Sequence, residues 1–167
     1  FSRRVILNRG QQQNVAPGQI VVDELGVIGQ VTRVYPMLSE VTLITDKDQA
    51  VPVQVVRNGL RAVMFGTGDG RLELRFLAAN ADVQEGDELV TSGLDGIYLP
   101  GLPVARVKKV DREATYAFAR ILCEPVAGVE RHGMALLLGQ REPIPPLPQD
   151  AGESEKDKPQ KSRRPAR

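Results

Sequence analysis

Residues 50–77 read AVPVQVVRNGLRAVMFGTGDGRLELRFL, and this stretch decides the fold class. Two of its segments alternate apolar residues with others: Val51–Val55 through its valines, and Arg71–Phe76 through its leucines and Phe76. Alternation with a period of two residues is typical of a β-strand with one buried face. We therefore expect Phe76 on the buried side with the leucines, and the charged residues of the same strand in solvent.

The dipeptides Asn58-Gly59 and Asp69-Gly70 separate the three apolar segments of this stretch. Such dipeptides favour type I′ turns, in which both central residues have φ above zero. We predict that residues 50–77 form a three-stranded antiparallel meander.

Short segments of the same kind continue along the chain to about residue 140. Each is rich in Val, Ile, Leu, Thr or Tyr and is bounded by turn residues, and no long window keeps a helical period without a Gly or Pro. The sequence predicts an all-β fold. We expect strands at residues 3–8, 19–23, 26–34, 39–45, 50–56, 60–65, 71–77, 87–91, 103–110, 115–124 and 134–138.

An internal repeat divides the predicted strands into two groups. Val15–Val22 resembles Val83–Val90 at a spacing of 68 residues, and a Gly-rich turn and another strand follow each copy. The repeat predicts two small tandem β-barrels of mostly antiparallel strands, because a closed sheet has no unpaired edge. We place the first barrel in residues 1–60, where C-terminal strands can join it, and the second in 61–140. Turn positions are expected at Gly26, Gly29, Asn58, Gly59, Gly93, Gly96 and Gly101.

The last segment, residues 141–167, differs in composition. It holds six of the 12 prolines and no aromatic residue, and its seven basic and five acidic residues give it a net charge of +2. A segment with so few apolar residues cannot bury a core, so we expect a disordered Pro-rich tail. Its prolines suit either a stiff linker, which we favour, or a PxxP ligand for another protein.

Composition argues against several classes of function. The chain is 41% hydrophobic but only 4% aromatic, and its net charge is +1. Nucleic-acid-binding barrels combine a basic groove with aromatic stacking platforms, so we expect no nucleic acid as partner. A single cysteine, Cys123, excludes an intrachain disulfide and is predicted to be a small core residue.

Catalytic and metal-binding patterns are weak. His132 is the only histidine, and it follows every serine of the predicted folded part, against the order of a double-barrel serine protease. Gly66–Gly70 lacks the Lys-Ser/Thr of a phosphate-binding loop, and Asp46–Asp48 opens no calcium loop. We therefore expect no catalytic residue, no metal and no cofactor.

One segment indicates binding. Gly96–Pro103 is an apolar loop bracketed by Gly and Pro, and exposed apolar loops with an aromatic residue often mark protein contacts. The alternative is that its aromatic residue folds back to close one end of a barrel. The protein-contact hypothesis assigns the interaction to Ile97, Tyr98, Leu99 and Leu102.

An ordered set of segments resembles the β-domain of the rod shape-determining MreC family. The set covers residues 3–138, and no single motif in it is decisive. The matching segments are Val21–Asp23, Gly26–Val31, Leu43–Asp46, Ala50–Val55, Val90–Gly96, Pro100–Val104, Ala127–Arg131 and Leu136–Leu138.

The resemblance implies a function that composition does not reveal. Members of this family are non-enzymatic scaffolds of the bacterial elongation machinery, acting in the periplasm and anchored to the inner membrane by an N-terminal helix that this chain lacks. The implied partners are a class B penicillin-binding transpeptidase, MreD, RodA and the MreB cytoskeleton. Self-association as a dimer or filament is implied as well.

Two alternatives remain beside the scaffold hypothesis. One is a protease-like hydrolase built on a double barrel, with His132 as its base. The other is a module that binds peptidoglycan directly, although sugar sites usually present exposed aromatic faces and the chain has only four Phe and three Tyr.

Overall fold

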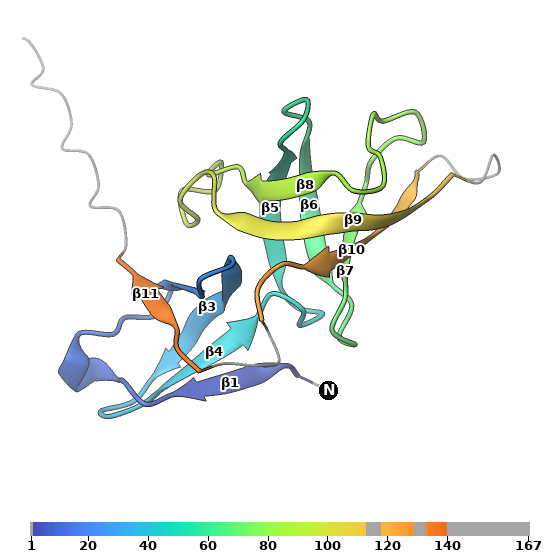
Figure 1. The fold of residues 1–167 in the computed structure, drawn as a ribbon. Coiled ribbons are helices and arrows are strands. Elements are labelled where there is room, and N and C mark those ends of the chain that lie inside the picture. Colours follow the sequence, from blue (N-terminus) through green and yellow to red (C-terminus); the bar gives the residue numbers. More distant parts are fainter. Residues whose placement is uncertain (1, 113–117, 129–132, 140–167) are drawn as a thin grey trace, which may run out of the picture.

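The computed structural model describes residues 2–112, 118–128 and 133–139, and they form two antiparallel sheets (Figure 1). The first sheet has five strands in the order β1-β4-β3-β2-β11. Its strands are β1 (Arg4–Leu7), β2 (Ile20–Val22), β3 (Val27–Val34), β4 (Ser39–Leu43) and β11 (Leu136–Leu138). A short 3₁₀ helix, η1 (Gln11–Gln13), lies between β1 and β2.

The second sheet is a closed six-stranded barrel in the order β10-β7-β6-β5-β8-β9, in which β9 and β10 also pair. Its strands are β5 (Ala50–Val55), β6 (Arg61–Gly66), β7 (Leu72–Arg75), β8 (Glu88–Thr91), β9 (Pro103–Asp111) and β10 (Arg120–Pro125). Every predicted strand segment contains a strand, so the all-β prediction is confirmed. Only η1 was not expected from the sequence.

Sheet membership changes between β4 and β5, and the chain returns to the first sheet at its last strand. β11 pairs with β2, with Leu137 opposite Val21. The division into units at residue 60 stays a prediction. The tail from residue 141 lies outside the described residues.

The predicted meander of residues 50–77 is confirmed, because β5, β6 and β7 pair in sequence order. Its turns differ from the prediction. Gly59 has a φ of +71°, whereas Asn58 is not among the residues with positive φ, so the turn is not type I′. Asn58 instead uses its side chain, whose Oδ1 accepts a hydrogen bond of 3.0 Å from the Leu60 N–H. Asp69 likewise lacks a positive φ, which Gly68 and Gly70 supply on either side of it.

The internal repeat has the same backbone geometry in both sheets. Gly18 and Gly86 have φ of +88° and +90°, and their N–H groups donate to the carbonyls of Val31 and Val107 at 2.8 and 2.9 Å. The residue after each glycine then accepts a bond of 2.9 Å from the N–H of the same valine. The repeat therefore describes one turn-and-strand unit used once in each sheet.

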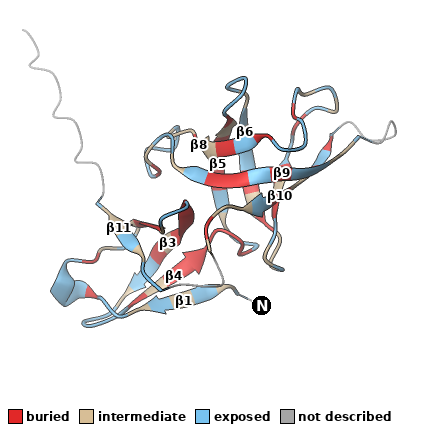
Figure 2. Cartoon of the chain, in the orientation of Figure 1, coloured by how far each residue is buried: buried red, intermediate tan, exposed pale blue. Residues whose placement is uncertain are grey.

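The two sheets share one hydrophobic core. Buried residues lie on strands of both sheets and in the connection between them (Figure 2). The linker between β4 and β5 is held at this junction: the Gly68 N–H donates to the Thr45 carbonyl at 2.9 Å, and the Arg3 N–H donates to the buried Asp46 carboxylate. Contacts from the residue before β1, from the linker and from the β6–β7 turn thus meet at one point.

Candidate interaction surfaces

The predicted contact loop lies between β8 and β9, and its aromatic residue points inward. Tyr98 is 4% exposed, and no described residue hydrogen-bonds to its hydroxyl group. Burial, followed by the charge of Asp95, raises the pKa of the Tyr98 phenol above its ordinary value. The sequence analysis left two alternatives for Tyr98, an exposed protein contact and a side chain folded back into the barrel. Its burial favours the second.

Thr91, the last residue of β8, fixes the shape of this loop. Its hydroxyl group donates to the Leu99 carbonyl and accepts a bond of 2.9 Å from the Leu102 N–H. The backbone of Thr91 also bonds to both Gly101 and Leu102 at 2.9 Å. A fully buried hydroxyl group therefore ties both halves of the loop to the barrel.

The other residues predicted in this loop differ in exposure. Ile97 is 53% exposed, whereas Leu99 and Leu102 are half-buried, and Leu102 packs against the core. Leu94, which the prediction omitted, is 61% exposed. The loop therefore offers Leu94 and Ile97 to a partner, and not Tyr98.

The predicted turn positions serve different purposes. Gly59, Gly93, Gly96 and Gly101 have φ between +69° and +86°, a region that favours glycine. Gly29 lies inside β3 and not in a turn. Glycine suits this position because a Cβ there would meet the Thr42 carbonyl oxygen. Gly26 precedes β3 at the junction of the sheets, where a Cβ would meet the Pro103 carbonyl oxygen.

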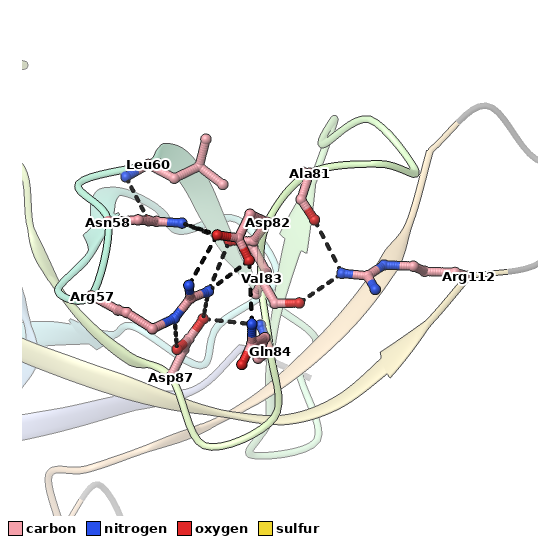
Figure 3. A network of polar contacts seen from close by, with 9 residues as sticks. All are labelled: Arg57, Asn58, Leu60, Ala81, Asp82, Val83, Gln84, Asp87 and Arg112. Carbon is pink, nitrogen blue, oxygen red and sulfur yellow. Dashed lines mark hydrogen bonds and ion pairs between the residues drawn. The ribbon is translucent and has the colours of Figure 1, made fainter.

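Arg57 organises a polar network at one end of the barrel (Figure 3). Its guanidinium group bonds to both carboxylate oxygens of Asp87 at 2.8 and 3.0 Å, and to those of Asp82 at 2.9 Å each. The same guanidinium lowers the pKa of Asp82 to about 2 and that of Asp87 below its ordinary value. With every partner satisfied, the network is a clamp between turns and carries no free acid or base.

The outer wall of the barrel presents an aromatic surface that the sequence pattern did not predict. Phe76 is 73% exposed, so its predicted place on the buried side is wrong. Between the pairs Leu74–Ile121 and Ala78–Phe118, one strand advances four residues and the other three. This extra residue is a β-bulge, and it turns Phe76 outward with a φ of +63° while Leu77 takes the buried position.

A sequence signal for this bulge exists. Phe76 and Leu77 are consecutive apolar residues at the end of an alternating strand. Two neighbours cannot both face the core of a regular strand. Such a pair therefore indicates either that the strand is irregular at this point or that one of the two apolar side chains is exposed.

A groove of about 500 Å³ lies between the two ends of the first sheet. It is lined by the end of β1 and the two residues after it, by Asp23 and Glu24 after β2, and by residues 134–137. Met134 in this lining is 86% exposed. The groove is apolar and open, so it is a surface feature and not an enclosed ligand cavity.

The described residues hold no chemical centre of the kinds considered from the sequence. His132 lies outside them. Among them, no three His, Cys, Asp or Glu side chains are grouped to hold a metal, and no helix is long and apolar enough to cross a membrane. Cys123 is 1% exposed, and burial raises the pKa of its thiol to about 12, which confirms the prediction of a core residue.

Comparison with known proteins identifies the family. Residues 1–138 match the family described as rod shape-determining protein MreC, barrel core. The chain belongs to the MreC family. The cell shape-determining protein MreC of Haemophilus influenzae is 41% identical over 139 residues, which are 83% of this chain and 40% of that protein. The Escherichia coli MreC is also 41% identical over 139 residues, which are 38% of its length.

Solved structures of MreC proteins share the fold. The crystal structure of MreC from Pseudomonas aeruginosa is 44% identical with a TM-score of 0.81, and the match covers 83% of this chain and 90% of that one. A complex between penicillin-binding protein PBP2 and MreC from Helicobacter pylori matches with a TM-score of 0.60 at 25% identity, over 76% of this chain and 79% of that one.

These matches confirm the family resemblance and the all-β barrel fold. Of the two barrels predicted from the sequence, the described residues close the second, and the strands of the first form a five-stranded sheet. The MreC family is one of cell shape-determining structural proteins and not of enzymes, which confirms the prediction of a non-enzyme. The chain spans less than half the length of the curated relatives it matches.

Proposed function

We propose that this chain is the part of a cell-shape scaffold that binds a penicillin-binding transpeptidase and regulates peptidoglycan synthesis in lateral wall growth. The observation that carries the proposal is the match to an MreC protein solved in complex with PBP2. Exposed apolar side chains on the loop after β8 and on the barrel wall supply surfaces for such a contact.

The proposal includes a location and further partners. The full-length protein acts in the periplasm and is anchored to the inner membrane. It works with MreD, RodA and the MreB cytoskeleton, and it associates with copies of itself. Membership of the MreC family supports these points.

Regulation follows if the scaffold binds one state of the enzyme better than another. A ligand shifts a two-state equilibrium only by its difference in affinity for the two states. We expect tighter binding to a transpeptidase locked in its active conformation than to one locked in its inactive conformation. Equal affinity for the two forms would refute the regulatory part of the proposal, because equal binding shifts nothing.

Binding itself is tested by interferometry between this chain and the ectodomain of the elongation-specific transpeptidase of the same bacterium. Saturable binding is expected. The loop is tested with Ile97→Ser and Leu94→Ser, because truncation of the buried Tyr98 would disturb folding. Loss of binding in both variants would place the contact on the loop, whereas unchanged binding would keep the function and discard the loop.

A further inference from the structure

The tight turn between β3 and β4 exposes four consecutive residues that carry no charge. These are Tyr35, Pro36, Met37 and Leu38, which we call the apolar tip. Met37 is 63% exposed, Tyr35 43% and Leu38 38%. Figure 1 shows this turn beside η1, at the end of the first sheet that points away from the barrel. The apolar tip therefore projects from the molecule at a place that the barrel does not cover.

Four polar groups of the tip backbone are bonded within the protein. The Tyr35 N–H donates to the Leu38 carbonyl at 2.8 Å. The Gln11 N–H of η1 donates to the Tyr35 carbonyl at 2.9 Å, and the Gln12 N–H donates to the Pro36 carbonyl at 3.0 Å. A backbone group that leaves water without a partner costs free energy. These bonds, together with the missing N–H of proline, lower the cost of moving the tip into an apolar phase.

Close contact with η1 also fixes the shape of the tip. A Cβ at Gly10, the residue before η1, would meet the Tyr35 carbonyl oxygen and backbone atoms of Met37 and Leu38. Only glycine lets the two segments approach so closely. The tip is therefore held in one shape by its support, and docking needs little further ordering of the chain.

The segments that form and support the apolar tip are basic. Residues 4–14 and 32–40 carry three arginines and one carboxylate, a net charge of +2. That carboxylate, Glu40, is paired with one of the arginines at 2.8 Å. The other two, Arg9 and Arg33, are exposed and form no ion pair with a described residue. The tip is thus an apolar point with a positive rim.

Charge and shape decide between occupants. A contact between the tips of two copies would bring Arg9 and Arg33 toward the same arginines of the other copy, and like charges oppose association. A stable protein interface buries about 800 Å² on each partner, more than a turn of four residues presents. A bilayer needs no complementary pocket, because apolar side chains enter its interface while arginines meet its anionic headgroups.

We propose that the apolar tip inserts into the interface of a bilayer that contains anionic lipids. The inference goes beyond the function proposed above, because it assigns a lipid surface and not a protein to this end of the molecule. Anchoring to the inner membrane, which is part of that proposed function, keeps the tip near such a surface and raises its effective concentration. Tyr35 suits this depth, since its ring is apolar and its hydroxyl group is polar.

The first test uses the absence of tryptophan from the chain, so that a single one reports its surroundings. We expect the fluorescence of Met37→Trp to shift to shorter wavelength with vesicles made of equal parts phosphatidylglycerol and phosphatidylcholine. Leu94→Trp is the matched control, because Leu94 is 61% exposed on the loop after β8. Its emission should stay unchanged. An equal shift in both variants would overturn the inference, since binding would then not depend on the tip.

The second test measures cosedimentation of the unmodified chain with the same vesicles. Tyr35→Ser and Met37→Ser remove exposed apolar surface and leave the buried core intact. We expect each to lower the partition coefficient about tenfold with an unchanged melting temperature. Leu94→Ser should sediment as the unmodified chain does.

Charge is tested with glutamine variants of the two exposed arginines. Arg33→Gln should weaken binding to the anionic vesicles about fivefold, and added salt should weaken binding of the unmodified chain. Arg9 shares the lining of the groove with Asp23 and Glu24, so we expect a smaller effect of Arg9→Gln. Binding that is equal on vesicles of phosphatidylcholine alone would overturn the role of anionic lipid.

The outcomes are separable from those for the transpeptidase. No vesicle binding by the unmodified chain, or equal binding by Tyr35→Ser and Met37→Ser, would overturn the inference. Interferometry with the transpeptidase ectodomain is run on the same two variants. Loss of that binding, with vesicle binding unchanged, would make the tip a protein contact and overturn the inference. Retained transpeptidase binding leaves the proposed function standing whatever the vesicles show.

Discussion

Tyr98 carries a polar group into the protein interior without a partner for it among the described residues. A buried hydroxyl group that makes no hydrogen bond loses its interactions with water and gains none in return. Burial of the Tyr98 ring therefore stabilises the folded protein, whereas burial of its unpaired hydroxyl group destabilises it.

We predict that Tyr98→Phe raises the free energy of unfolding by about 1–3 kcal/mol, because it removes the unpaired hydroxyl and keeps the ring. Tyr98→Ala should lower it by about 3–5 kcal/mol, as other truncations of buried aromatic residues do. Urea denaturation measures both changes. A Tyr98→Phe variant less stable than the unmodified protein would show that the hydroxyl has a partner.

The raised pKa of Tyr98 predicts a loss of stability in alkali. The folded state holds the phenol proton more tightly than the unfolded state, whose pKa is about 10. The stabilisation is complete below that pH and is lost as pH rises above it. Unfolding free energies measured from pH 8 to 11 should fall more steeply in the unmodified protein than in Tyr98→Phe, and parallel curves would contradict this.

At the scale of elements, the repeated turn shows how one backbone unit uses two different side chains. In the first copy Gln19 Oε1 accepts from the Ala16 N–H at 3.1 Å, and in the second Asp87 Oδ2 accepts from the Gln84 N–H at 2.9 Å. Only the second copy carries a charge, and Arg57 from the turn after β5 neutralises it. The clamp therefore links two turns of the barrel that are 30 residues apart.

We predict that Asp87→Asn lowers the free energy of unfolding by about 1–3 kcal/mol, because a charge-assisted bond from Arg57 is lost while the turn can keep its acceptor. Asp82→Asn should cost less, since its side chain is 60% exposed. Thermal unfolding compares the two variants with the unmodified protein. An equal loss of stability in the two variants would show that the burial of Asp87 does not strengthen its bond with Arg57.

The same clamp predicts how the protein behaves in acid. The pKa of Asp82 falls to about 2 and that of Asp87 is lowered as well, so the folded state favours both carboxylates. Their stabilisation is present above pH 4 and is lost as pH falls toward 2. An Arg57→Gln variant should show a weaker dependence of unfolding free energy over this range, and an unchanged dependence would exclude the clamp as its source.

At the scale of the whole molecule, the junction of the two sheets depends on close backbone contact. Gly66 ends β6 beside the linker, and a Cβ there would meet the Asp46 carbonyl oxygen. The same linker is bonded to Arg3 and, through Thr45, to Gly68. The junction has no room for a side chain at this point, which fixes how the barrel meets the first sheet.

We predict that Gly66→Ala lowers the free energy of unfolding by about 1–3 kcal/mol, because the linker must move to admit a methyl group. Gly133→Ala is the matched control, since a Cβ there meets no atom within 4 Å and its φ lies outside the positive region. It should change stability by less than about 0.5 kcal/mol. Denaturation of the two variants in parallel tests the prediction. If Gly66→Ala were as stable as Gly133→Ala, the linker could move to admit a methyl group at no cost in free energy.

Strand positions and family membership could be predicted from the amino-acid sequence alone. Strand positions follow from a local property, the alternation of apolar side chains between turn residues, and the repeat at Val15 and Val83 predicted a unit present in both sheets. Glycine positions such as Gly59 and Gly93 were also readable, because turns with positive φ select glycine locally.

Strand pairing and the direction of individual side chains could be established only from the three-dimensional structure. β11 joins β2 across more than 100 residues of chain, and Arg57 meets Asp82 from 25 residues away. Phe76 turns outward against the local pattern, because the bulge opposite Ala119 overrides alternation. Tyr98 turns inward, a choice that the sequence left open. Such contacts depend on how the whole barrel closes and fills its core, and a period of two residues carries no information about either.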